Sequence, residues 1–347
     1  MKKTISVAVL TNETGAHLGA YFSALKEIDD VETVFLADPS QQQVELARKT
    51  LGAKLGQVYQ QADQLFQQQT PDMALVTMEA RQAPAAIDLA LEQGCHVFAE
   101  KPACLNVGQF EPLVRKAESK HLNLSLALAN RTNPEIQFAR SLIQEGTLGK
   151  IYGVEMTLLA DQTRLTNPAY HQSWYAHQDR AGGGFLSWLG IHWLDLSMFL
   201  TGASIAEVSG FTALVGEQPI TIEDSAALSF RYDTGFLGTL TAGYYLNRGY
   251  QSMIKIWGSK GWLEMLPFED RPLEWTVNHN GKKYRFEKAT EPRGYTPAVR
   301  KAVRAVAGQS EPLLTSRESL RIIRTIYAFY DAARSGKTQT ISADPMN

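Results

Sequence analysis

Short apolar runs alternate with amphipathic segments over the first third of the chain. The runs predict strands at Ile5–Leu10, Val31–Ala37, Met73–Thr77, His96–Ala99 and Leu122–Leu128. The segments between them repeat apolar residues every three or four positions and predict helices at Gly15–Ile28, Val44–Leu51, Ala83–Gln93 and Phe110–Lys120. Near-continuous apolar strands separated by helices indicate a parallel sheet covered on both faces. We therefore expect a doubly wound α/β domain with its ligand site beyond the carboxyl ends of the strands.

The pattern changes after Arg131. A helix, a long strand and an apolar helix are predicted at Pro134–Glu145, Tyr152–Ala160 and Phe185–Leu200. Consecutive strands follow at Ala206–Val215, Ser225–Tyr232, Phe236–Tyr244, Gln251–Trp257 and Trp262–Met265, and helices at Thr296–Val306 and Ser316–Ser335 close the sequence. Serial strands without intervening helices indicate a mainly antiparallel sheet. The last helix begins with a capping box, Thr315 with Glu318. We expect two domains, residues 1–129 and 130–347.

Composition narrows the function classes. The chain has 347 residues, enough for two domains, and its formal charge of -2 gives no electrostatic case for nucleic acid or an anionic membrane. The apolar run Ile5–Leu10 is too short for a membrane span. Cys95 and Cys104 are the only cysteines, which indicates ordinary thiols of a reducing cytoplasm. His171 and His177 lack the spacing of metal ligands, so no metal is predicted.

The turn after the first strand departs from a dinucleotide-binding pattern. In G-x-G-x-x-G, glycines let a pyrophosphate reach backbone N–H groups at a helix start. Here Thr11, Glu13 and Ala16 occupy the three glycine positions, and Gly15 follows Glu13 at an altered place. Thr11 and Asn12 offer hydrogen-bond donors, whereas Glu13 brings negative charge. Two interpretations stay open: a modified phosphate loop, or a strand–helix turn that holds no nucleotide.

Asp38 ends the second predicted strand, about 20 residues beyond the turn. An acidic residue there accepts a hydrogen bond from the ribose 2′-hydroxyl of NAD and repels the 2′-phosphate of NADP. NAD is therefore predicted rather than NADP. The alternative is a turn residue before Pro39.

Several motifs occur in an order that points to one family. They are Glu100-Lys101-Pro102 after the fourth strand, Asn130-Arg131 after the fifth, Gly146-Thr147-Leu148-Gly149, Gly182-Gly183-Gly184 with Gly190, His192 and Asp195, and Glu223-Asp224. In this combination the chain resembles the Gfo/Idh/MocA oxidoreductases, the glucose–fructose oxidoreductase and inositol dehydrogenase family.

The resemblance implies a Rossmann domain followed by an α+β domain with an open, mainly antiparallel sheet. It implies NAD(P)-dependent chemistry at a hydroxyl carbon of a sugar, polyol or related small molecule. It also implies a homodimer or homotetramer, with the sheet often forming the interface.

The resemblance also assigns roles to residues. Lys101 and His192 are the implied catalytic pair, a cation at the reacting oxygen and an acid/base, because hydride loss from a carbinol requires both. Their alternatives are a solvated lysine at a strand end and an ordinary core histidine. Candidate cofactor-binding residues are Thr11, Asn12, Gly15, Ala16, Asp38, Glu79, Glu100, Lys101 and Asn130, and candidate substrate-binding residues are Arg131, Tyr170, His171 and Trp174.

Other positions depart from the family pattern. Trp188 stands where many members have an aspartate one turn before the histidine, so Asp195 is the candidate to orient the His192 ring. Trp188 is a candidate to stack on a sugar face or to fill the core. Met78-Glu79 replaces the usual Pro-Asn, and Gln82 replaces a common histidine.

Three functions follow from these observations. The first is an NAD-dependent oxidoreductase acting on a sugar-like substrate. The second is an NAD-assisted glycosidase or lyase, which the altered acid/base pair favours. The third is a non-catalytic nucleotide- or sugar-binding protein, favoured by Glu13 and Trp188 and opposed by Lys101 and His192.

Overall fold

The computed structural model describes residues 4–269, 272–278, 281–287 and 293–342. Its contacts divide the chain into two compact units. The described residues of the first are 4–132, 179–182 and 293–323, and those of the second are 133–178, 183–287 with the gaps above, and 324–342. The units therefore do not follow a single cut after residue 129, because two later segments join the first unit.

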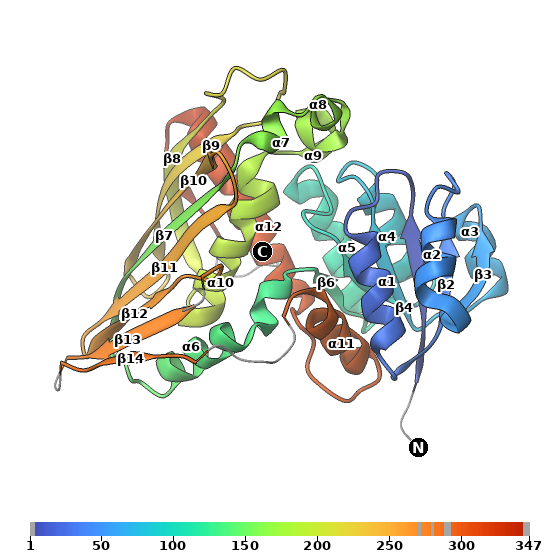
Figure 1. Cartoon of the computed structure of the whole chain (residues 1–347), viewed down its shortest axis with the longest axis horizontal. Coiled ribbons are helices and arrows are strands. Elements are labelled where there is room, and N and C mark those ends of the chain that lie inside the picture. Colours follow the sequence, from blue (N-terminus) through green and yellow to red (C-terminus); the bar gives the residue numbers. More distant parts are fainter. Residues whose placement is uncertain (1–3, 270–271, 279–280, 288–292, 343–347) are drawn as a thin grey trace. The chain divides into compact units, whose positions relative to one another are not determined.

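The first unit contains a parallel sheet of six strands in the order β3-β2-β1-β4-β5-β6 (Figure 1). The strands are β1 (Ile5–Thr11), β2 (Val31–Ala37), β3 (Leu55–Tyr59), β4 (Met73–Thr77), β5 (His96–Ala99) and β6 (Leu124–Leu126). All neighbours pair in parallel. The predicted doubly wound Rossmann architecture is confirmed.

The five-strand prediction for this sheet is wrong by one strand. Strand β3 and the following helix α3 (Ala62–Gln68) are missing from it. β3 is an edge strand in which only Tyr59 is buried, and Gly56 and Gln57 interrupt its apolar residues. Because an edge strand needs no continuous apolar run, hydrophobicity alone does not reveal it.

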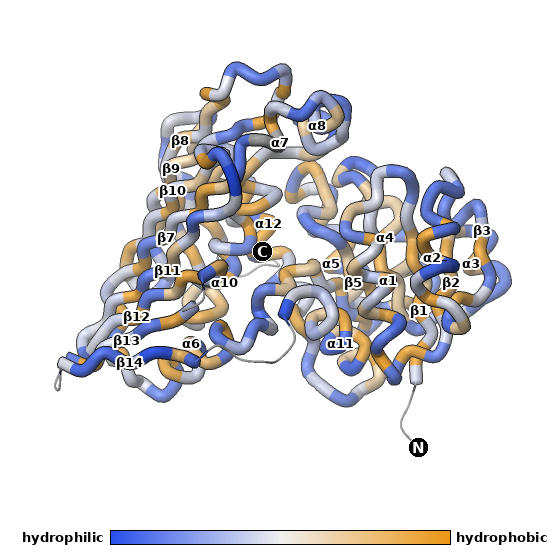
Figure 2. Tube along the Cα trace, viewed as in Figure 1, coloured by the Kyte–Doolittle hydropathy of each residue, from blue (hydrophilic) through white to orange (hydrophobic). Residues whose placement is uncertain are grey.

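Helices cover both faces of this sheet. They are α1 (Leu18–Glu27), α2 (Val44–Leu51), η1 (Gly52–Lys54), α3, α4 (Ala83–Glu92), α5 (Val107–Ser119), η2 (Ala129–Thr132) and α11 (Tyr295–Val306). α4 packs on α5, while α11 packs on α1, on the face nearer the viewer in Figure 1. Along α1 and α2 the tube alternates between hydrophobic and hydrophilic positions, as expected for helices with one buried face (Figure 2). Helix α11 thus completes the α1 face from a distant part of the sequence.

The outer edge of β6 is closed by the start of α12 (Ser316–Ser335). The Leu124 N–H donates to the Ser316 hydroxyl at 2.9 Å, and the Leu126 N–H donates to the Ser319 hydroxyl at 3.2 Å. The Asn123 amide donates to the Leu314 carbonyl at 3.0 Å. These bonds supply the partners that an edge strand otherwise lacks, and they explain why this late segment belongs to the first unit.

The predicted capping box at the start of α12 is confirmed. The Glu318 N–H donates to the Thr315 hydroxyl at 3.2 Å, and the Thr315 N–H donates to the Glu318 carboxylate at 2.9 Å. Arg131 donates to the other Glu318 oxygen at 2.7 Å. Burial raises the pKa of Glu318, but Arg131 and the Thr315 donors outweigh it, so that the pKa lies below 4.5.

The second unit contains a nine-stranded sheet in the order β14-β13-β12-β11-β7-β10-β9-β8-β15. The strands are β7 (Ile151–Asp161), β8 (Ile205–Ala213), β9 (Ser225–Tyr232), β10 (Leu237–Leu246), β11 (Tyr250–Gly258), β12 (Gly261–Met265), β13 (Leu273–Val277), β14 (Lys283–Arg285) and β15 (Gln339–Thr340). Among the strands that the structure describes, only β10 and β7 pair in parallel, so the sheet is mixed and mainly antiparallel, as predicted. Strands β13, β14 and β15 were not predicted.

The helical elements of this unit are α6 (Pro134–Gln144), α7 (Thr163–Thr166), α8 (Pro168–Gln172), η3 (Trp174–Ala176), the π-turn η4 (Leu186–Gly190) and α10 (Ile191–Thr201). Helices α9 (Gln178–Ala181) and α12 each divide between the units. α10 packs on α6 and β7. Within the described ranges, no helix is both long and apolar enough to cross a membrane.

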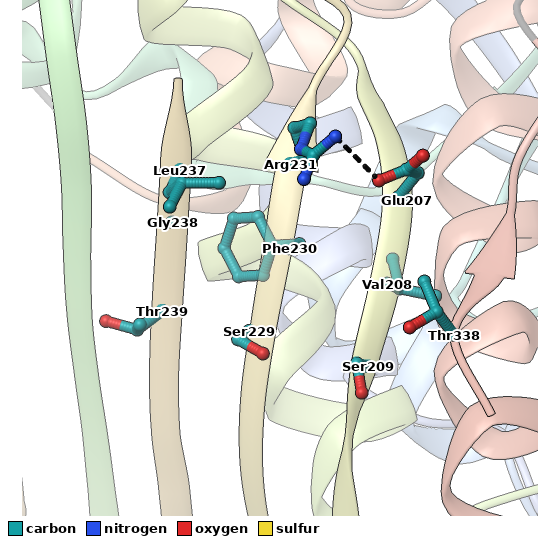
Figure 3. A pocket seen from close by; sticks show the side chains of 10 residues that line it. All are labelled: Glu207, Val208, Ser209, Ser229, Phe230, Arg231, Leu237, Gly238, Thr239 and Thr338. Atoms are coloured by element: carbon teal, nitrogen blue, oxygen red, sulfur yellow. Dashed lines mark ion pairs between the residues drawn. The ribbon is translucent and has the colours of Figure 1, made fainter. Parts of the chain in front are cut away.

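One part of the nine-stranded sheet presents a shallow groove across β8, β9 and β10 (Figure 3). Arg231 pairs with Glu207 at 3.4 Å across the strands. Phe211, Leu237 and Tyr152 on β8, β10 and β7 are 76%, 59% and 61% exposed. The sheet therefore carries large apolar side chains in water, an uncommon feature of a surface that stays uncovered.

The Glu318 contacts predict a pH-dependent stability. Because the folded-state pKa is depressed, the contribution is present above the unfolded value and is lost as pH falls through the folded value. We expect Glu318→Gln to lower the free energy of unfolding by about 1–3 kcal/mol at pH 7, since the buried Arg131 guanidinium loses the negative charge of Glu318. In urea titrations this deficit should stay constant from about pH 7 down to about pH 5 and shrink as the pH falls below the unfolded value of about 4.3 toward the folded one.

Glu318→Ala is the matched control, because glutamine preserves the capping box and alanine does not. The alanine variant should lose about 1 kcal/mol more than the glutamine variant at every pH. A glutamine deficit that does not change with pH would contradict the assigned role of the Arg131 pair.

Candidate functional site

The turn between β1 and α1 is held together by Asn12. Its side-chain oxygen accepts from the Thr14 N–H at 2.9 Å and from the Thr14 hydroxyl at 2.6 Å. Its main-chain oxygen accepts from the Gly15 N–H at 3.2 Å. The Thr14 hydroxyl in turn accepts from the Glu79 N–H at 3.0 Å, which links this turn to the end of β4. Asn12 therefore shapes the loop from inside.

Thr77 fixes the second half of the same turn. Its hydroxyl accepts from the Ala16 N–H at 2.9 Å and donates to the Ala16 carbonyl at 2.7 Å. The Thr11 hydroxyl donates to the Thr77 carbonyl at 2.8 Å. A Cβ added at Gly15 would lie 2.2 Å from the Thr11 hydroxyl oxygen and 2.8 Å from a Leu18 methyl carbon. Glycine is needed at position 15 because these groups approach so closely.

The loop fits a dinucleotide diphosphate in three respects. Its four predicted residues, Thr11, Asn12, Gly15 and Ala16, come together at the start of α1. Glu13, which brings negative charge to this turn, is exposed to solvent, so its side chain does not fill the turn. Helix α1 has no acidic residue in its first turn and no side-chain cap, which leaves the positive end of its dipole without a nearby negative side chain from that turn.

Asp38 lies in a turn at the end of β2 and has no exposed surface. Its carboxylate accepts from the Ser40 N–H and hydroxyl at 3.0 and 2.6 Å and from the Gln43 N–H at 2.9 Å. These are the bonds of a turn and cap residue, the alternative that the sequence left open.

Glu100 and Lys101 follow β5 at the carboxyl edge of the sheet, and each is only 3% exposed. The buried Tyr21 hydroxyl of α1 donates to Glu100, and the Lys101 N–H donates to the other Glu100 oxygen at 3.2 Å. Burial first, and the Glu100 charge second, raise the pKa of Tyr21 well above 10.0. Glu100 thus ties the end of β5 to the helix that begins at the nucleotide loop, and Lys101 is a buried lysine rather than a solvated one.

Glu79 forms a charge cluster that sequence reasoning did not find. Its side chain is fully buried and accepts from Arg81 Nε at 3.1 Å and from Arg180 Nε at 2.7 Å. The Arg81 N–H also donates to the Arg180 carbonyl at 3.1 Å. The departure from Pro-Asn at Met78-Glu79 was the available signal, because a buried carboxylate needs cationic partners. Glu79 therefore anchors residues 179–182 to the first unit.

The two predicted residues after β6 differ in burial: Arg131 is buried in ion-pair and hydrogen-bond contacts, whereas Asn130 is partly exposed. Arg131 is 4% exposed and bonds to Glu318 and to the Leu313 carbonyl at 3.4 Å, so it joins the late segment to the first unit. Asn130 is half-buried in η2.

In the second unit, Glu223 sits at the start of the helical segment that carries Trp188 and His192. Its carboxylate accepts from the Gly184 N–H at 2.7 Å, the Leu186 N–H at 2.9 Å and the Tyr330 hydroxyl at 2.8 Å. Burial raises the pKa of Glu223 despite these donors. A Cβ on Gly184 would lie 2.1 Å from the Glu223 carbonyl oxygen, which explains a glycine here.

The segment itself is a π-turn, η4, continued by α10. Such insertions in helices occur frequently at functional sites. Trp188 and His192 are half-buried, whereas Asp195, one turn after the histidine, is 1% exposed. The predicted residues Lys101 and His192 belong to different units.

Trp188 packs in an aromatic cluster formed by Tyr170, Trp174, Tyr175 and Trp188. The Trp174 and Tyr175 rings stack with centroids 4.1 Å apart, and Trp188 meets them edge-on at 5.5 and 4.6 Å. Tyr170 lies parallel to Tyr175 at 6.3 Å. His171 contacts the Leu165 carbonyl through Nε2, a contact within its own loop. Tyr175 was not among the predicted substrate residues.

Comparison with protein families gives a match for each of two parts of the chain. Residues 14–128 match the oxidoreductase family with an NAD-binding Rossmann fold, and residues 136–264 match the GFO/IDH/MocA C-terminal domain. The chain belongs to the Gfo/Idh/MocA oxidoreductase family.

Individual relatives are distant. Myo-inositol 2-dehydrogenase of Thermotoga maritima is 23% identical over 256 residues, which cover 73% of this chain and 72% of that protein. An oxidoreductase domain protein from Kribbella flavida superposes with a TM-score of 0.87 at 23% identity, covering 99% of this chain and 100% of the other. The WlbA dehydrogenase from Bordetella pertussis, in complex with NADH and UDP-GlcNAcA, gives 0.82 at 20% identity with coverages of 99% and 100%.

The packing around Gly15 predicts opposite effects for two substitutions nearby. Gly15→Ala should destabilise the protein by about 1–3 kcal/mol and weaken NADH binding, because the new methyl group collides with Thr11. Gly19→Ala, in helix α1 just after this turn and with no atom within 4 Å of its added Cβ, should stabilise by about 0.5–1 kcal/mol. Urea unfolding and NADH fluorescence titration measure both effects. Equal behaviour of the two variants would count against this account of the loop.

Proposed function

We propose that this protein is an NAD-dependent oxidoreductase that transfers hydride between nicotinamide and a hydroxyl carbon of a sugar, polyol or related compound. The observation that carries the proposal is Lys101. It is a buried lysine that follows β5, and its main-chain N–H donates to the neighbouring Glu100 carboxylate, which also accepts from Tyr21 of the helix after the nucleotide loop. Open α/β sheets bind their ligands at this edge.

The residues of the nucleotide loop and the start of α1 would hold the cofactor diphosphate, and Asn130 and Glu100 would border the site. When bound, NAD supplies a hydride acceptor. We assign to Lys101 the stabilisation of negative charge on the substrate oxygen, since an ammonium favours an alkoxide. We assign to His192 the transfer of the hydroxyl proton, with Asp195 as its supporting residue.

A sugar-like substrate is supported by the aromatic cluster. Sugar rings combine apolar faces with polar edges, and half-buried Trp188, Tyr170 and Tyr175 offer flat surfaces beside hydrogen-bonding groups. The bound sugar nucleotide of the WlbA dehydrogenase structure is in keeping with this substrate class. Trp188 is proposed to contact the substrate ring.

NAD is proposed over NADP because Asp38 places a buried negative charge at the end of β2. A 2′-phosphate near that charge would lose binding energy. Titration with NADH and NADPH should give tighter binding of NADH, and equal affinities would remove the argument from Asp38.

Two substitutions test the catalytic assignment. Lys101→Met and His192→Asn should each lower kcat for NAD-linked oxidation of an accepted polyol by about 10²–10⁴-fold, because each removes a group that acts on the reacting oxygen. The affinity for NADH should change little in the His192 variant. His177→Asn, at a half-buried histidine without an assigned role, is the matched control and should retain activity.

A redox-neutral reaction is the second candidate, favoured by Trp188 in place of an aspartate before His192. Cleavage or elimination of a glycoside without net NADH formation would support it. Net NADH formation that matches product would support the oxidoreductase. Failure to bind NAD(H) at all would overturn both.

We also propose that the exposed sheet face joins copies of this chain into a homodimer or homotetramer. Phe211 and Leu237 are large apolar side chains in solvent on neighbouring parts of the same sheet. Leu237→Glu should shift the mass measured by light scattering toward the monomer, because a charge is costly to bury. Leu46→Glu, at a residue of α2 that is 38% exposed, should leave the mass unchanged. A monomeric unmodified protein would refute the assembly.

A further inference from the structure

A cavity of about 270 Å³ lies within the first unit, away from the cofactor edge of its sheet. It is lined by Met73, His96, Val97, Phe98, Asn123, Ser125, Ala302, Ala305, Val306, Ser310, Glu311, Pro312 and Leu313. Met73 and His96 are the first residues of β4 and β5, whereas Glu79 and Lys101 follow the last residues of the same strands. The cavity is therefore at the opposite ends of these strands from the proposed cofactor site.

The cavity exists because α11 covers the strands incompletely. Helix α11 presents Ala302, Ala305 and Val306 to the space in front of Phe98 and Ser125. Two alanines cannot fill the distance that larger side chains bridge elsewhere in the core. The segment after α11, with Pro312 and Leu313, closes the remaining side.

Ser125 gives the cavity an unused polar group. It lies on β6 beside Phe98 of β5, and both residues line the cavity. Ser125 is 3% exposed, and its hydroxyl has no hydrogen-bond partner among the residues that the structure describes. A buried hydroxyl without a partner costs free energy, which a hydrogen-bonding ligand would recover.

The residues that line the cavity favour a ligand without charge. Most of the residues around the cavity are apolar, and Glu311, the one carboxylate of the lining, is exposed. The His96 Nδ1 accepts from the Asn123 N–H at 3.1 Å, which is the arrangement of a neutral imidazole. An anion would find no cation in the lining, and a cation would have to leave water for apolar walls.

We propose that this cavity is a second ligand site, for a neutral planar ring compound about as large as indole that carries one hydrogen-bonding group. A cavity of about 150 Å³ accepts benzene, so 270 Å³ accommodates a fused bicycle. The ring packs between Phe98 and the α11 alanines, and its polar group bonds to the Ser125 hydroxyl.

Indole and indene are the probes, because they share shape and differ in the N–H group. Ligand-observed NMR titration of the full chain should detect both at up to millimolar concentration. Ser125→Ala should weaken indole about five- to tenfold and leave indene unchanged. Ala305→Phe should fill the cavity and abolish binding of both probes while the melting temperature is kept or raised.

Each result decides the proposal. No binding of either probe to the unmodified protein overturns it, and so does binding that Ala305→Phe leaves intact. Equal loss of indole and indene in Ser125→Ala overturns the hydrogen bond to Ser125. If the Ala305 variant does not fold, the Ser125 comparison still decides. None of these outcomes depends on NAD binding or on catalysis.

Discussion

The unpaired edge of β6 is the constraint on which the first unit depends. A parallel sheet ends in a strand whose outward N–H groups must find partners, and Leu124 and Leu126 find them in the hydroxyls of Ser316 and Ser319. These partners lie more than 190 residues further along the chain. The first unit is therefore completed only after strands β7 to β14 of the second unit have been synthesised. The Arg131–Glu318 ion pair also connects the start of α12 to the segment after β6.

Most of the fold follows from hydrophobic periodicity, and its errors have physical reasons. Buried parallel strands such as β1 and β4 are continuous apolar runs, and the capping box marks the start of α12 to the residue. Strand β3 lacks such a run, because an edge strand is only partly buried. Membership of residues 293–323 in the first unit was not predictable, because it rests on the packing of α11 against α1 and on side-chain bonds to β6, and not on any local pattern.

The positions of several candidate site residues in the fold followed from the sequence, whereas their bonding partners did not. Gly15 and Ala16 lie in the turn as expected, and Lys101 is buried at the expected strand end. Glu79 and Arg131 were expected to bind ligands, which stays a prediction, and the structure gives each of them an ion pair inside the first unit that the sequence did not predict. The sequence does not distinguish a charged residue that binds a ligand from one that pairs with a distant segment of the chain, because its partner is known only once the fold is known. Arg180, the partner of Glu79, was equally impossible to identify as an ion-pair residue from the sequence.

The turn built around Asp38 has a consequence for redesign of cofactor preference. Exchange of the acidic residue after β2 is the obvious route toward a phosphorylated ribose, but this carboxylate holds the amides of Ser40 and Gln43 and the Ser40 hydroxyl. Removal of the Asp38 carboxylate would break the hydrogen bonds that hold the residues before α2. This loss would accompany any reduced repulsion of a 2′-phosphate. Engineering that leaves Asp38 in place and introduces a basic side chain at exposed Gln42 would keep the turn intact while changing its charge, whereas the Gln41 amide donates to the Asp38 carbonyl at 2.6 Å and belongs to the turn.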